Sequence, residues 1–283
     1  MITGASGKTG RELLRALVRR GAAVRVLVHK QEQAAGSSAL GAAEALSGDL
    51  RDAALLRQAA QGVEKIYHIC PNAQPDEIEI GEAVIGAARE AGIGQLVFHS
   101  VLHPQVEEMP HHWKKLRVEE LLFKSGVPFT ILQPAVYMQN VLAQWEGIIS
   151  NGVYAVPYAA DTRLGMVDLM DVAEAAAAVL TQPGHLGAIY ELAGGEVLTQ
   201  AEVAQEFARE IGRDVRVEVT PREAWEQRSR ASGLPDYAVR TLLQMFEYYE
   251  KFGFWGNPTV LTALLGRAPT TFAEFVARTL GKK

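Results

Sequence analysis

Hydrophobic residues recur along the first half of the chain with two alternating periodicities. Residues 13–18 carry an apolar stripe at helical spacing, whereas residues 24–28 place valine at every second position, as a strand does. The alternation continues to about residue 134, with expected strands at 1–3, 23–29, 43–47, 65–70, 95–100 and 128–134 and expected helices at 11–21, 52–62, 79–92 and 111–126. This order predicts a doubly wound α/β fold, in which helices cover both faces of a parallel sheet.

The pattern changes after residue 150. Residues 165–180 and 187–194 predict one more helix and strand, which could return to the same sheet. From residue 199 the pattern is mainly helical, with expected helices at 199–211, 221–230, 235–251, 258–266 and 270–280 and one strand at 215–219. We therefore expect two interleaved domains: residues 1–150 with 163–196 returning to their sheet, and a smaller, mostly helical lobe within 151–283.

Composition and charge exclude several classes of function. The formal net charge is -5 and the basic residues are scattered, which argues against nucleic acid as the main ligand. No apolar run approaches the ~20 residues of a membrane span. Cys70 is the single cysteine, so neither an internal disulfide nor a cysteine-based metal site is expected. A cytoplasmic protein is the default expectation.

The stretch TGASGKTG at residues 3–10 places Gly4, Gly7 and Gly10 between an expected strand and an expected helix. Glycine lets the backbone approach a pyrophosphate, and the helix start supplies free N–H groups. The neighbouring Ser6, Lys8 and Thr9 are expected to take part. An ordinary structural turn is the alternative, because turns are rich in glycine. Only three residues precede Gly4, so we expect a very short first strand or missing upstream residues.

The residues after the second and third strands bear on which dinucleotide binds. NAD-binding proteins usually place an acidic residue about 20 positions beyond the turn, but this chain has His29 and Lys30 there. Lys30 would attract a 2′-phosphate, so we expect NADP(H) rather than NAD(H), unless both residues are simply solvated. Asp49 and Leu50 follow the third strand and are expected at the adenine, although Asp49 could instead cap the next helix.

Four segments together resemble the NmrA-like family of atypical short-chain dehydrogenase/reductases. They are TGASGKTGRELLRALVRRG, SGDL, VPFTILQPAVYMQN and MVDLMDVAEAAAAVL. The resemblance implies an NAD(P)-binding Rossmann fold with a smaller C-terminal lobe. It also implies either an NAD(P)H-dependent reductase, including quinone reductases, or a redox sensor that binds the nucleotide without turning it over. After the fourth strand, Pro71 and Asn72 are expected to face the cofactor.

The resemblance leaves catalysis open. Typical short-chain dehydrogenases use a serine and a Tyr-x-x-x-Lys pair; here Ser100 and Lys115 fit that pattern, but His111 stands where the tyrosine would be. Lys115 could assist proton transfer, alone or with His111 or His103. Alternatively, the acceptor takes its proton from water, or Lys115 only holds the cofactor ribose. We expect His111 and His112 singly to lie at a solvated helix start, and Ser100 could be merely a hydrogen-bonded strand end. A metal site is not expected.

A substrate pocket is expected where the chain leaves the sixth strand. The resemblance places Pro134 and Ala135 against the nicotinamide ring, with Tyr137 and Asn140 at its border. Alternatively, this segment starts a helix, and Tyr137 packs in the core between the lobes. Further aromatic residues would suit a flat apolar ring, or would form the core of the small lobe: Phe246, Tyr249, Phe252, Phe254 and Trp255.

The expected function is therefore NADP(H)-dependent hydride transfer to a small apolar acceptor such as a quinone. A non-catalytic redox sensor acting through a regulatory protein partner is the alternative. A sugar-nucleotide epimerase is disfavoured, because such enzymes normally need the missing tyrosine. The sequence leaves the substrate open, and it does not decide whether the chain forms a homodimer.

Overall fold

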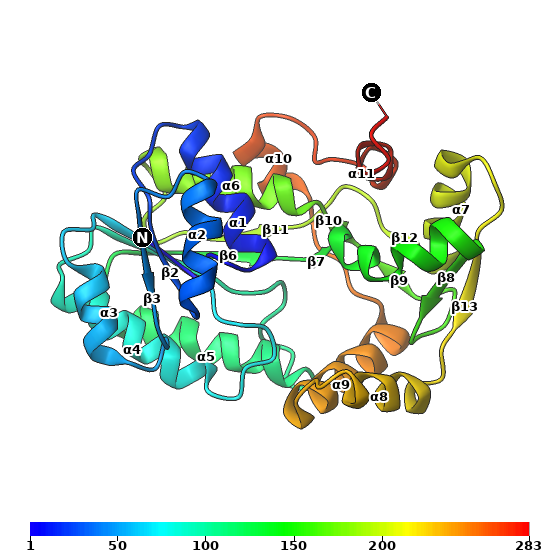
Figure 1. Ribbon diagram of the computed structural model, residues 1–283, viewed down its shortest axis with the longest axis horizontal. Coiled ribbons are helices and arrows are strands. Elements are labelled where there is room, and N and C mark those ends of the chain that lie inside the picture. The colour runs from blue at the N-terminus through cyan, green and yellow to red at the C-terminus, as the bar shows by residue number, and fades with distance from the viewer. Residues whose placement is uncertain (283) are drawn as a thin grey trace. The chain divides into compact units, whose positions relative to one another are not determined.

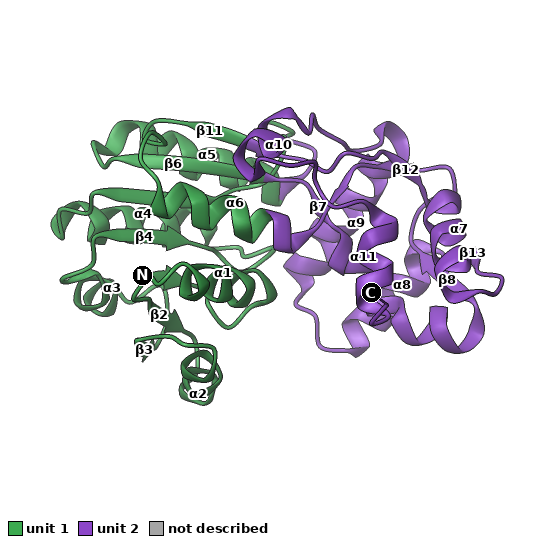
Figure 2. Ribbon diagram, turned by 90° about the horizontal axis from the view of Figure 1, so that it is seen from above, with its two compact units in different colours: residues 1–106, 111–133, 172–190 green, residues 107–110, 134–171, 191–283 purple. Residues whose placement is uncertain are grey.

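The computed structural model describes residues 1–282, which form two compact units (Figure 2). The first unit contains residues 1–106, 111–133 and 172–190. The second contains residues 107–110 and 134–171 and the chain from residue 191 onward. The unit boundary nearest to the expected domain boundary at residue 150 lies after Gln133, where the sixth strand ends and the chain leaves the sheet.

The first unit is built on a seven-stranded sheet with the order β11-β6-β5-β4-β1-β2-β3. The strands are β1 (Ile2–Thr3), β2 (Arg25–Val28), β3 (Glu44–Ser47), β4 (Lys65–His68), β5 (Gln95–His99), β6 (Phe129–Pro134) and β11 (Ile189–Leu192). Strand β1 pairs in parallel with β2 on one side and with β4 on the other. The strand order therefore reverses beside β1, and the carboxyl edge there is the usual place for a ligand in such sheets.

Helices cover both faces of this sheet, as Figure 1 shows: α1, α2 and α6 lie on one face, and α3, α4 and α5 on the other. Their bounds are α1 (Lys8–Arg19), α2 (Gln31–Ala39), α3 (Ala53–Ala60), α4 (Glu77–Glu90), α5 (Pro110–Ser125) and α6 (Leu169–Thr181). The predicted doubly wound α/β fold is confirmed. Helix α2 was not predicted, because its sequence QEQAAGSSA has no apolar stripe.

The main core lies between the sheet and helices α3, α4 and α5. It buries aliphatic residues from every layer, among them Leu56 on α3, Val84 on α4, Val118 on α5 and Ile66 on β4. Helices α4 and α5 approach closely, because a Cβ at Gly81 would lie 2.7 Å from a methyl carbon of Val118.

The second unit is helical with three small strand pairs. The helices are α7 (Gln200–Ile211), α8 (Arg222–Ala231), α9 (Asp236–Phe252), α10 (Thr259–Leu265) and α11 (Phe272–Thr279). The pairs join β7 (Val136–Tyr137) to β10 (Met166–Val167), β8 (Val153–Val156) to β13 (Arg216–Val219), and β9 (Arg163–Leu164) to β12 (Leu198–Thr199). Of these strands only β13 was predicted, since runs of two to four residues carry little periodicity. Within residues 1–282, no helix has the length and apolarity that a membrane crossing needs.

The aspartates of the segment DLMDVAEAA anchor the C-terminal part of the second unit. Asp168 is buried, and it accepts hydrogen bonds from Gln139 at 2.6 Å and from Arg278 at 2.5 Å. Asp171 is also buried, and it accepts from Arg267 at 2.7 Å and from the Thr270 N–H at 2.6 Å. This part of the family resemblance is therefore explained by packing within the second unit.

Four buried histidines lie at the ends of β4 and β5 and at the start of α5. Burial is the main cause that lowers their pKa values, to about 3 for His68 and His99, about 2 for His111 and about 4 for His112. Each is therefore neutral in the folded protein at neutral pH, whereas an unfolded histidine titrates near pH 6.5.

These histidines predict loss of stability in acid. As the pH falls below about 6.5, the unfolded chain binds protons that the folded chain does not, so the free energy of unfolding decreases. Each such histidine contributes up to about 1.4 kcal/mol per pH unit. Urea unfolding at a series of pH values between about 7 and about 5 measures the slope, and His111→Leu should flatten it. A free energy of unfolding that does not change over this range would contradict the prediction.

Candidate functional site

The glycine turn is imposed in part by the packing of the chain itself. Gly4 has φ +64°, and a Cβ there would lie 2.8 Å from the carbonyl oxygen of Ile69. A Cβ at Gly10 would lie 2.5 Å from both Ala5 Cα and the Gly4 carbonyl oxygen. Gly4 thus allows the turn to pass against the end of β4, and Gly10 lets α1 pack against the turn.

Gly7 differs, because the protein's own packing does not require a glycine there. It is the N-cap of α1 with φ −72° and ψ 165°, a conformation that any residue adopts. The nearest neighbour of a Cβ would be the Gly4 carbonyl oxygen at 3.4 Å. Gly7 leaves the helix start without a side-chain cap, and no acidic residue occupies the first turn. A bare helix N-terminus of this kind fits the pyrophosphate of a dinucleotide.

The other predicted residues of the turn surround this helix start. Ser6 and Thr9 are half-buried, and Lys8 is exposed. His29 and Lys30 follow β2, and both are exposed. Lys30 is the N-cap of α2, where its N–H donates to Gln33 Oε1 at 3.0 Å and its carbonyl accepts from the Gln33 N–H at 3.0 Å. The backbone of Lys30 is therefore held in place, while its side chain stays in solvent.

Asp49 does not cap the following helix, so that alternative is wrong. Asp52 is the cap of α3, where its carboxylate accepts from the N–H groups of Ala54 and Leu55. Asp49 is instead held by Arg51, whose backbone N–H and Nε donate to it at 2.9 and 3.0 Å. These hydrogen bonds lower the pKa of Asp49 to about 2. Arg51 also reaches Asp76 at 3.3 Å, a link that nothing in the sequence pattern indicated.

The remaining residues expected near the adenine and the cofactor face are accessible. Leu50 is half-buried, and Pro71 and Asn72 are exposed in the loop after β4. Their contact with a nucleotide remains a prediction, as does that of Asp49.

Lys115 lies on α5 and forms a buried ion pair with Glu77, the first residue of α4. Lys115 Nζ lies 2.5 Å from Glu77 Oε1, and the two residues are 7% and 1% exposed. The ammonium also lies 5.6 Å from the centre of the Phe98 ring. The sequence pattern marks Lys115 but not Glu77, because the acidic first turn of α4 also contains the exposed Glu79.

Ser100 belongs to a second buried group. Its Oγ donates a hydrogen bond to Oε1 of Glu119, one helical turn beyond Lys115. Gln133 Nε2 donates to both oxygens of Glu119, at 2.9 and 3.1 Å. Burial raises the pKa of Glu119, while these hydrogen bonds act in the opposite direction. The hydroxyl proton of Ser100 is therefore directed to Glu119 in this arrangement.

His111 and His112 are not at a solvated helix start, and that expectation is wrong. They are 5% and 0% exposed, and their rings pack edge to face with centroids 4.4 Å apart. Burial, followed by His112 and then Lys115, lowers the pKa of His111 to about 2. A neutral imidazole holds no spare proton at neutral pH, which favours Lys115 over His111 as a proton donor.

The predicted substrate residues begin at the end of β6. Pro134 is buried, Tyr137 is half-buried on β7, and Asn140 is exposed in a 3-10 helix over Met138–Gln144. Phe254 is buried and stacks on Tyr249 with ring centroids 5.0 Å apart. Phe254 thus contributes to the core of the second unit, and whether any of these residues touches a substrate remains a prediction.

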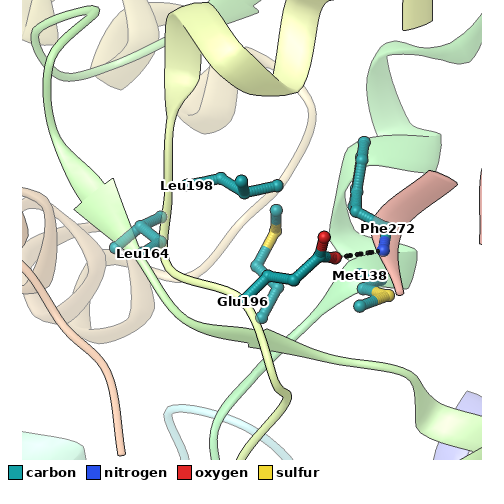
Figure 3. Close-up of a pocket in the computed structure, with 6 residues that line it drawn as sticks. Met138, Leu164, Glu196, Leu198 and Phe272 are labelled. Atoms are coloured by element: carbon teal, nitrogen blue, oxygen red, sulfur yellow. Dashed lines mark hydrogen bonds between the residues drawn. The ribbon is translucent and has the colours of Figure 1, made fainter. Parts of the chain in front are cut away.

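Two aromatic residues beside Phe254 are exposed: Phe252 to 51% and Trp255 to 45%. Figure 3 shows a separate hollow in the second unit, where Glu196 accepts a hydrogen bond from the Phe272 N–H at 2.6 Å. Its lining residues include Met138, Leu164 and Leu198. The hollow has no room even for a water-sized sphere, whereas ligand pockets usually measure about 300 to 1,000 Å³, so it does not hold a ring-sized acceptor.

Comparison with known proteins matches residues 1–276 to the NmrA-like family. The chain is 29% identical to quinone oxidoreductase 2 of Escherichia coli strain K12 over 98% of this chain and 96% of that protein. It is 28% identical to an NAD(P)H azoreductase of Xenophilus azovorans, over 97% and 96% of the two chains. The NADPH complex of the E. coli quinone oxidoreductase superimposes with a TM-score of 0.86 at 28% identity, covering 99% of both chains.

The family match spans nearly the whole chain, and the fold and the glycine turn agree with it. This chain therefore belongs to the NmrA-like family, the NAD(P)-binding, Rossmann-type atypical short-chain dehydrogenase/reductases.

Proposed function

We propose that this protein is an NADPH-dependent reductase that transfers a hydride to a planar apolar acceptor such as a quinone. The observation that carries the proposal is the bare helix start at Gly7, which the chain's own packing does not require. The quinone oxidoreductase and the azoreductase with 28–29% identity support a reductase acting on conjugated acceptors.

The bound dinucleotide would supply the hydride. The protein would bind both the dinucleotide and the acceptor, and would deliver the proton. In the overall reaction, a quinone, NADPH and one proton give the hydroquinone and NADP+. A quinone needs little acid catalysis, because negative charge on its oxygens is delocalised over the ring. We assign Lys115 to stabilise that charge and to donate the proton, since its ammonium is balanced by Glu77 while His111 is neutral.

The exposed aromatic residues of the second unit support a flat acceptor. Trp255 is 45% exposed, yet its position is restricted. A Cβ at Gly165 would lie 2.8 Å from Trp255 Cβ, and a Cβ at Gly253 would lie 2.4 Å from the indole ring. Two glycines thus make room for an indole that remains open to solvent, and an aromatic face of this kind suits stacking with a planar ring.

NADPH rather than NADH is the proposed donor. Lys30 and His29 are exposed beyond β2, and no acidic side chain occupies either position. A cation there favours a 2′-phosphate, whereas an acid would repel it.

The acceptor reaction is tested by following NADPH oxidation with a panel of quinones, azo dyes and simple aldehydes. We expect turnover with quinones, and a Lys115→Met variant should lower kcat by about tenfold, a modest loss because a quinone needs little acid catalysis. Tight NADPH binding with no turnover of any acceptor would contradict the reductase and favour the non-catalytic sensor.

The pyrophosphate site is tested by comparing Gly7→Ala with Gly10→Ala. The Gly7 variant should keep the fold and weaken NADPH binding by about tenfold, because the added methyl group lies on the open helix start. The Gly10 variant should lower the melting temperature, because its Cβ would collide with backbone atoms. Circular dichroism and calorimetric titration measure both effects. Unchanged NADPH affinity in the folded Gly7 variant would contradict the assignment.

The cofactor preference is tested with Lys30→Glu. We expect NADPH affinity to fall by about tenfold or more while NADH affinity stays within about twofold, because only NADPH carries the 2′-phosphate. The matched control is Glu32→Gln, an exposed residue in the first turn of α2. Equal wild-type affinity for the two nucleotides, unchanged in Lys30→Glu, would exclude this role for Lys30.

A further inference from the structure

The ion pair between Lys115 and Glu77 is an unusual feature for a protein to bury. Both residues are almost fully enclosed, at 7% and 1% exposure, and Nζ lies 2.5 Å from Oε1. Removing two charges from water costs about as much as, or more than, their mutual attraction returns. Apolar side chains would fill the same space between α4 and α5 at lower cost, so stability alone accounts poorly for the pair.

The carboxylate of Glu77 differs from that of Glu119 in the hydrogen bonding of its second oxygen. Glu77 Oε2 is buried and has no hydrogen-bond partner among residues 1–282. Glu119 lies on the next turn of α5. Both of its oxygens accept hydrogen bonds from Gln133, and one also accepts from Ser100. Buried carboxylate oxygens are normally hydrogen-bonded, so Glu77 Oε2 is left for a donor that arrives with a ligand.

The pair and the glycine turn both belong to the first unit. The charge of Lys115 contributes to lowering the pKa of His68 and His99, the last residues of β4 and β5. His68 Nδ1 lies 2.8 Å from the hydroxyl oxygen of Thr3, the residue before Gly4. His68 therefore contacts the residue before the turn, and its pKa also responds to the charge of Lys115.

Lys115 has the donors that a ribose needs. An ammonium carries three N–H groups, and the carboxylate of Glu77 is the hydrogen-bond partner that the structure gives it. The remaining N–H groups can donate hydrogen bonds to the hydroxyls of a sugar, provided that the flexible lysine side chain is held in one direction. Glu77 supplies that restraint from α4, a different helix.

We propose that Glu77 is a positioning residue for dinucleotide binding: its buried carboxylate holds the Lys115 side chain directed at the cofactor's ribose hydroxyls. The proposal rests on the nucleotide-binding part of the proposed function and does not depend on which acceptor is reduced. It adds a residue outside the glycine turn to the set that determines NADPH affinity.

The test is calorimetric titration of the full chain with NADPH, in a double-mutant cycle of Glu77→Gln and Lys115→Met. We expect Glu77→Gln to raise the Kd for NADPH by about tenfold or more, because the lysine loses its restraint. In the Lys115→Met background, the same substitution should change the Kd by less than about twofold. The matched control is Glu79→Gln, an exposed acid in the same helical turn, which should leave the Kd unchanged.

Circular dichroism and thermal unfolding show whether each variant is folded. If the Glu77→Gln variant does not fold, the Glu77→Asp variant replaces it, because aspartate keeps the negative charge but places it one methylene further from Lys115. The Kd of this variant for NADPH should also rise. A folded Glu77 variant with wild-type NADPH affinity would overturn the proposal, as would equal effects of Glu77→Gln in the wild-type and Lys115→Met backgrounds. Failure of the proposed function looks different: the wild-type chain then binds no NADPH, or binds it and reduces no acceptor.

Discussion

The close approach of α1 to the ends of β1 and β4 is the constraint on which the nucleotide site depends. It exists only because Gly4 and Gly10 have no Cβ, since a methyl group at either position would meet backbone atoms at 2.8 Å or less. Gly7, the N-cap, has no side chain, so the first N–H groups of α1 have no side-chain cap. Gly7 then leaves those groups open to an anion.

A second set of buried polar groups lies at the ends of β4 and β5 and on α5, the helix that carries Lys115. Histidines that burial keeps neutral, an ion pair and the Ser100–Glu119–Gln133 group lie within the first unit. Of these groups, the ion pair alone combines a full positive charge with a carboxylate oxygen that lacks a partner among residues 1–282. For this reason the proposed function assigns proton donation to Lys115, in a chain that lacks the tyrosine typical of short-chain dehydrogenases.

Much of the fold could be predicted from the sequence, because strands β2 to β6 and most helices carry clear periodicity. Helix α2 could not be predicted, since its polar and small residues form no apolar stripe. Capping hydrogen bonds at its ends and packing against β2 and β3 hold it in place. The glycine turn and Lys115 were also within reach, because strand-turn-helix context and the family resemblance mark them. The burial of His111 and the ion pair of Glu77 with Lys115 could not be predicted. Both depend on how α4 and α5 pack, and the local pattern of a single sequence does not reveal that packing.

The most direct measurement is a crystal structure of the full chain with NADPH bound. The account predicts the pyrophosphate against the backbone N–H groups that follow Gly7, the 2′-phosphate beside Lys30, and the ammonium of Lys115 within hydrogen-bond distance of the ribose next to the nicotinamide. A nucleotide bound elsewhere on the chain, or one whose pyrophosphate does not contact the start of α1, would contradict it.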